Sequence, residues 1–129
     1  METDVLVVDD SAAIRKILQR VLRQTGIAIR TIHEAGDGQE ALEILKVHRP
    51  DLVLTDINMP KMDGLQFLAA MKGSEQWRGI PVVMVTTEGG EAKVAEAVKL
   101  GAAGYVRKPF TADQIKEKLA GILAPGLPL

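Results

Sequence analysis

The stretch DLVLTDINMP, residues 51–60, places an acid directly after a short apolar run. A continuous run such as Leu52 to Leu54 is typical of a strand that is buried on both faces of a sheet. Asp56 follows this run, and Pro60 interrupts regular pairing because proline has no backbone N–H to donate. The stretch therefore predicts a central strand that presents one carboxyl group at its carboxyl end.

Similar runs recur along the chain. They are VLVVDD at 5–10, IAIRTIHEA at 27–35, PVVMVTT at 81–87 and AGYVRKP at 103–109. The segments between them carry apolar residues at steps of three and four, which is the pattern of a helix that buries one face. The helices are expected in SAAIRKILQRVLRQTG at 11–26, GDGQEALEILKVH at 36–48, DGLQFLAAMK at 63–72, EAKVAEAVKLG at 91–101 and TADQIKEKLAGIL at 111–123.

Several of these helices have recognisable ends. Ser11 and Thr111 are suitable N-cap residues, and Gly26 favours the end of the first helix. Asp63-Gly64 is interpreted as a turn and helix start, with a structural role. The buried face of the first helix is predicted to carry Ile14, Ile17, Leu18, Val21 and Leu22.

The strand–helix unit repeats five times, which predicts an α/β fold. This order is typical of a parallel sheet with helices on both faces and right-handed crossovers. The length of 129 residues suits one domain. We expect this domain over residues 1–124, followed by a flexible Pro/Gly-rich tail over residues 125–129.

The composition excludes several kinds of site and partner. The chain has no cysteine, which rules out disulfides, thiolate metal sites and cysteine catalysis. Its 16 basic and 17 acidic residues include no long run of one sign, so nothing favours nucleic acid or a membrane as a partner. No segment approaches the roughly 20 apolar residues that span a bilayer. We expect a soluble, cytoplasmic protein without a signal peptide.

Polar residues stand at the carboxyl ends of the predicted strands, where ligands bind in such folds. The residues expected to meet there are Asp9, Asp10, Asp56, Thr86 or Thr87, and Lys108. Three carboxylates at short range repel one another, and a bound cation relieves this repulsion. Oxygen ligands without histidine or cysteine favour Mg²⁺.

The same residues suit phosphoryl transfer. A carboxylate can form an acyl phosphate, so Asp56, at the centre of the group, is the candidate nucleophile. Lys108 and Mg²⁺ would neutralise the transferring phosphoryl group, and Thr86 would donate a hydrogen bond to the product. The structural alternative is that these acids cap helices, although Ser11 already supplies a cap beside Asp10.

The chain resembles the response regulator receiver domains, and among them the chemotaxis regulators. The matching pieces are VLVVDDS, EAGDGQEAL, DLVLTDINMPKMDGLQFL, IPVVMVTTE and GAAGYVRKPFT. They run in family order from about Val5 to Leu123, and the five together are far more specific than any one of them. The resemblance implies a flavodoxin-like, doubly wound sheet with strand order 2-1-3-4-5.

The resemblance also implies a role for each site residue. Asp56 would be phosphorylated, and Lys108, followed by a cis bond to Pro109, would contact the phosphoryl group. Thr86 would be the switch hydroxyl, and Tyr105 the aromatic residue that changes rotamer with it. The implied metal ligands are Asp10, Asp56 and the backbone carbonyl of Asn58, with Asp9 acting through water.

A receiver domain is a signalling module that catalyses only its own phosphorylation and dephosphorylation. The resemblance implies a histidine kinase as donor and a downstream partner on the face of the fourth helix, fifth strand and fifth helix. The chain would act as a monomer or a weak phosphorylation-dependent dimer. Asn58, Thr87 and Glu88 are expected to face the site and tune the phosphate lifetime.

Two positions on that face depart from a chemotaxis regulator of the family. Arg107 stands where that regulator carries an apolar residue, and Glu91 stands where it carries a lysine. These differences put the flagellar motor in doubt as the partner, but they do not affect the residues of phosphotransfer.

Two other functions compete with this one. An aspartyl-phosphate phosphatase of the haloacid dehalogenase type also uses an Asp at a strand end with Mg²⁺. It usually carries a second Asp two residues later, where this chain has Asn58, and it has a cap domain that is missing here. A flavodoxin would need a Ser/Thr-rich phosphate loop and aromatic residues beside the flavin, whereas the DDSAAI loop is acidic and aromatic residues are few.

Overall fold

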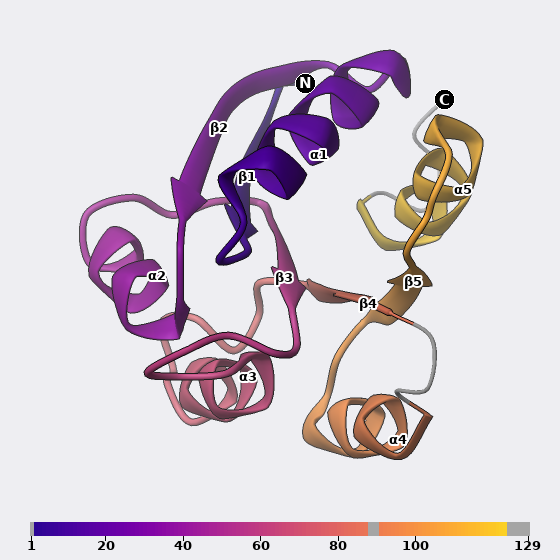
Figure 1. The fold of residues 1–129 in the computed structure, drawn as a ribbon. Coiled ribbons are helices and arrows are strands. Elements are labelled where there is room, and N and C mark those ends of the chain that lie inside the picture. Colours follow the sequence, from indigo (N-terminus) through magenta and orange to yellow (C-terminus); the bar gives the residue numbers. More distant parts are fainter. Residues whose placement is uncertain (1, 88–90, 124–129) are drawn as a thin grey trace.

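The computed structural model describes residues 2–87 and 91–123. Strands and helices alternate as predicted (Figure 1), in the order β1 Thr3–Val8, α1 Ala12–Gln24, β2 Ile29–Ala35, α2 Gly38–Leu45, β3 Leu52–Asp56, α3 Gly64–Lys72, β4 Val82–Thr86, α4 Glu91–Leu100, β5 Gly104–Arg107 and α5 Ala112–Leu123. The predicted tail at 125–129 and Glu88 lie outside the described residues.

The five strands form one parallel sheet in the order β2-β1-β3-β4-β5, which confirms the predicted fold class and strand order. Helices α1 and α5 cover one face of this sheet, and α2, α3 and α4 cover the other (Figure 1). None of the helices in the described part of the chain is long and apolar enough to cross a membrane.

Strand β3 lies at the centre of both apolar cores. Leu52 and Leu54 pack toward α1 and α5, and Val53 packs on the side of α2, α3 and α4. All three side chains are fully buried, as the apolar run predicts. Because both sides are held by packed helices, the end of β3 has little freedom to move.

Helix α1 begins as predicted, but its buried face is narrower than expected. The Ser11 hydroxyl accepts a hydrogen bond from the backbone N–H of Ile14 at 3.2 Å. Leu18 and Leu22 are buried, whereas Ile17 is 43% exposed, so its predicted burial is wrong. At about 100° of rotation per residue, Ile17 lies at the edge of the apolar stripe, farthest from Leu22.

The connection from β3 to α3 is held by backbone contacts. Asp63 caps α3 with a reciprocal capping box to Gln66, which agrees with the structural role predicted for it. The N–H of Gly64 donates to the carbonyl oxygen of Ile57 at 2.7 Å. The start of α3 is therefore tied directly to the residue that follows Asp56.

Candidate functional site

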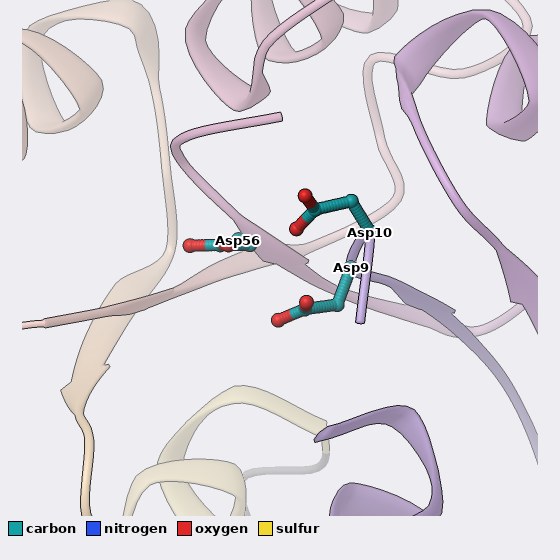
Figure 2. A group of neighbouring side chains, drawn as sticks. All are labelled: Asp9, Asp10 and Asp56. Carbon is teal, nitrogen blue, oxygen red and sulfur yellow. The ribbon is translucent and has the colours of Figure 1, made fainter. Parts of the chain in front are cut away.

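The register of β1 and β3 brings two acids to the same level. Val8 pairs with Thr55, so the next residue on each strand, Asp9 and Asp56, stands at the same edge of the sheet. Figure 2 shows these two carboxyl groups and that of Asp10 turned toward one space at the ends of β1 and β3. The convergence of the three acids follows directly from the parallel register.

The register of β4 and β5 places Thr86 and Lys108 progressively farther out along the same edge of the sheet. Asp56 pairs with Val85, so Thr86 stands one residue beyond the level of Asp56. Thr86 in turn pairs with Arg107, so Lys108 stands one residue further out. A long side chain at that position can reach back over the strand ends toward the acids.

The three acids form a compact set of oxygen donors. One carboxylate oxygen from each of Asp9, Asp10 and Asp56 lies within 4.8 Å of the others. Asp9 is 1% exposed, and one of its oxygens accepts from the backbone N–H of Ser11 at 2.9 Å. A donor set made only of carboxylate oxygens fits a hard divalent cation such as Mg²⁺ and does not suit zinc or copper.

Lys108 supplies the positive charge of the site. Its Nζ lies 3.0 Å from Asp9 Oδ2 and 3.6 Å from Asp56 Oδ2. The peptide bond between Lys108 and Pro109 is cis, as the resemblance implies. The backbone N–H of Lys108 also donates to the carbonyl oxygen of Thr86 at 2.7 Å, so β4 and β5 stay paired up to the site.

The two carboxylate oxygens of Asp56 have different surroundings. Oδ1 accepts a hydrogen bond from the N–H of Ile57 at 2.8 Å, while Oδ2 faces Lys108. Burial raises the pKa of Asp56 above its ordinary value, and Lys108 opposes this while Asp9 raises the pKa further. The charged form of Asp56 is therefore disfavoured, so a bound cation would stabilise it.

Thr86 and Tyr105 lie on neighbouring strands. Thr86 is buried, and its hydroxyl donates to the carbonyl oxygen of Thr87 at 3.2 Å. Tyr105 pairs with Met84, two residues before Thr86, and its ring is half-buried against the core on the α4 side. The ammonium of Lys118 lies 5.3 Å from the centre of this ring, a cation–π distance.

The two departures on the α4–β5–α5 face form one contact. Arg107 Nη2 donates to Glu91 Oε1 at 2.9 Å, which links the last residue of β5 to the first residue of α4. Beside this pair, an open hollow runs along β5 and α5. Its polar lining includes Tyr105, Arg107, Gln114, Glu117 and Lys118.

The structure shows two basic side chains near the site, Arg15 and Lys93, that the sequence did not identify. Arg15 of α1 donates to the backbone carbonyl of Asp9 at 2.7 Å and pairs with Glu34 at 3.0 Å, which holds the loop after β1 in place. Lys93 of α4 donates to the side-chain oxygen of Asn58 at 2.6 Å. Both are polar residues on amphipathic helices, and helical periodicity does not distinguish one surface cation from another.

Two further predicted residues, Asn58 and Thr87, stand close in the chain to Asp56 and Thr86. Both are exposed. Asp9, Asp10, Asp56 and Lys108 are thus brought into direct proximity, while Thr86 approaches from the next strand.

Comparisons with known proteins find similar sequences over most of the chain. The family profile of the response regulator receiver domain matches residues 5–120. The chain is 40% identical over 122 residues to a chemotaxis protein CheY homolog of Campylobacter jejuni, covering 94% of this chain and 92% of the relative. It is 42% identical over 119 residues to chemotaxis protein CheY1 of Helicobacter pylori, covering 92% and 94%.

A solved structure is also similar. The chemotaxis response regulator CheY4 of Vibrio cholerae matches with a TM-score of 0.80 and 34% identity, covering 95% of this chain and all of that one. These comparisons give no support to the phosphatase alternative.

Proposed function

This chain belongs to the response regulator receiver domain family, and on that premise we propose that Asp56 is its phosphoryl acceptor. The observation that carries the proposal is the contact of one partly buried ammonium, Lys108, with two of three converging carboxylates. A histidine kinase donates the phosphoryl group, and the protein changes its binding surface in response.

The transfer itself requires little covalent chemistry from the chain. An oxygen of Asp56 attacks the phosphorus of a phosphohistidine, the P–N bond breaks, and its electron pair returns to the imidazole nitrogen. Oδ2 is the candidate nucleophile, because Oδ1 already accepts from the N–H of Ile57. Lys108, close to Oδ2, stabilises the negative charge on the transferring group.

The residues that would hold Mg²⁺ are Asp9, Asp10, Asp56 and the backbone carbonyl of Asn58. When bound, this ion offsets carboxylate repulsion and neutralises phosphoryl oxygens. Hydrolysis returns the switch to its resting state: water attacks the phosphorus, the bond to Asp56 breaks, and the carboxylate is restored. The chain has no separate substrate in this scheme.

Phosphorylation is read out through Thr86 and Tyr105. The Thr86 hydroxyl has only a neighbouring carbonyl as its acceptor at 3.2 Å, and a phosphoryl oxygen is a stronger one. Movement of Thr86 toward the phosphoryl group frees space for the Tyr105 ring on the next strand. Both states exist beforehand, and phosphorylation shifts their balance.

The downstream partner binds the α4–β5–α5 face. The open hollow along β5 and α5 and the pair of Arg107 with Glu91 lie on this face. A partner that recognises an apolar residue and a lysine at these two positions would meet an arginine and a glutamate instead, so the pair contributes to partner choice.

Labelling with a small donor tests this proposal. Acetyl phosphate and Mg²⁺ are expected to add one phosphate mass to the protein, on the peptide that contains Asp56, and to add none to Asp56→Asn. Asp63→Asn is the matched control, since Asn is as good an N-cap as Asp and labelling should persist. Absence of the adduct from the wild-type protein, or its presence in Asp56→Asn, contradicts the proposal.

A further inference from the structure

Helix α4 reaches the phosphorylation loop through one lysine. Lys93, in the first turn of α4, donates from Nζ to Asn58 Oδ1 at 2.6 Å. Asn58 stands two residues after Asp56, so this ammonium lies at the rim of the acidic site. It comes from a different element than Lys108, which follows β5.

The present acceptor of Lys93 is a neutral amide oxygen on an exposed residue. Phosphorylation adds roughly −1.5 to −2 charges and three strong acceptor oxygens. A lysine carries its charge on a flexible four-carbon stem and binds a charged oxygen more strongly than a neutral one. Taking the proposed phosphorylation of Asp56 as a premise, we propose that Lys93 leaves Asn58 and binds a phosphoryl oxygen in the phosphorylated state.

The charges of the site favour this exchange. Three carboxylates converge there, and Lys108 is the cation in contact with them among the described residues. Lys108 is itself engaged by Asp9 at the shorter distance of 3.0 Å. A phosphoryl group adds negative charge to a set already dominated by acids, so a second ammonium at the rim stabilises the phosphorylated form.

In the first turn of α4, Val94 packs against the core but is only partly buried, and Lys93 beside it is exposed. Ala97 is the buried residue of this helix, and Val98 is 55% exposed. The first turn is also tied to β5 by the contact of Glu91 with Arg107. Movement of Lys93 toward Asp56 therefore acts on the partner-binding face directly, as a link additional to that of Thr86 and Tyr105.

Binding of beryllofluoride, an analogue of the phosphoryl group, tests this role. The affinity is measured by calorimetry at fixed Mg²⁺ for the wild type, Lys93→Met, Lys93→Arg and Lys99→Met. Loss of one exposed ionic contact is expected to weaken binding about two- to fivefold in Lys93→Met. Lys93→Arg should recover most of this loss because it retains the charge. Lys99→Met, an exposed site at the other end of α4, should bind like the wild type.

The outcomes separate this inference from the proposed function. If the wild type binds beryllofluoride and Lys93→Met binds it equally well, the role of Lys93 is overturned while that of Asp56 stands. An equal loss in Lys99→Met also overturns it, because the effect would then reflect net charge alone. A wild type that neither binds the analogue nor accepts phosphate at Asp56 refutes the proposed function and this inference with it. Circular dichroism checks that all variants are folded.

Discussion

At the scale of single residues, the surroundings of Asp56 disfavour its charged carboxylate when no cation is bound. Burial disfavours its charged state and raises its pKa, and Lys108 compensates only in part. Asp9 takes the closer contact with Lys108, at 3.0 Å against 3.6 Å for Asp56. This balance leaves Asp56 less stabilised in the absence of a cation than its central position suggests.

We predict that Asp56→Asn raises the melting temperature in metal-free buffer at pH 7. The expected rise is a few degrees, the shift that about 1 kcal/mol produces in a domain of this size. The pKa of Asp56 is raised in the folded state, so its contribution to stability is full below 3.8 and is lost as the pH rises through the folded pKa. The advantage of the variant should therefore be largest at neutral pH and shrink as the pH falls toward 3.8.

Thermal unfolding followed by circular dichroism across this pH range measures the effect. Glu75→Gln, which removes an exposed acid from the connection after α3, is the control and should leave the melting temperature nearly unchanged. A variant at Asp56 that melts below the wild type at pH 7 would show that Lys108 outweighs burial.

At the scale of elements, the close approach of α3 to the end of β3 positions the acceptor. The backbone N–H of Gly64 contacts the carbonyl oxygen of Ile57, and the turn leaves no room for a side chain. A Cβ on Gly64 would lie 2.1 Å from the backbone oxygen of Asp56 and 2.9 Å from the Cα of Ile57. Glycine is needed here for space.

We predict that Gly64→Ala destabilises the fold by about 1–3 kcal/mol, the usual cost of overpacking. It should also slow labelling of Asp56, because the added Cβ clashes with the backbone of Asp56 and Ile57 and relief of the clash displaces the end of β3. Gly121→Ala is the matched control: nothing lies within 4 Å of its added Cβ, and an exposed helical site should gain about 0.5–1 kcal/mol. Urea unfolding of both variants, together with acetyl phosphate labelling, checks the expectation. A Gly64 variant as stable as wild type would contradict it.

At the scale of the whole molecule, the site exists only in the folded chain. Its acids come from the residues after β1 and from the end of β3, and its ammonium follows β5. Asp9 and Lys108 are 99 residues apart in the sequence. A ligand that bridges these elements binds the folded state and not the unfolded one. Metal binding should therefore stabilise the entire domain by mass action.

We predict that Mg²⁺ raises the melting temperature of the wild type in a concentration-dependent way. A hundredfold excess over the dissociation constant corresponds to about 2.7 kcal/mol. Asp10→Asn should show a much smaller response, because it removes an exposed carboxylate proposed to contact the ion directly, while Glu75→Gln should respond like wild type. Removal of Mg²⁺ with a chelator should reverse the rise. An unchanged response in Asp10→Asn would exclude this residue as a ligand.

Much of the fold and the core of the site were predictable from local patterns. The run at 52–54 predicted a strand buried on both faces, and all three side chains are fully buried. Asp9, Asp10, Asp56 and Lys108 were identified because parallel strands end at one edge, which makes sequence position a guide to spatial position. The predicted burial of Ile17 was wrong. Periodicity shows which side of a helix faces the core, but it does not show how much of that side the neighbouring elements cover.

The sequence by itself determined the alternation of strands and helices, the central place of β3 and the acids at the strand ends, because these follow from local periodicity and chain order. Only the tertiary structure decided which atoms meet. The preference of Lys108 for Asp9 over Asp56, the pair of Arg107 with Glu91 and the contact of Lys93 with Asn58 all join residues from different elements. Such contacts depend on the register of the sheet and on the packing of α4, which no local pattern specifies.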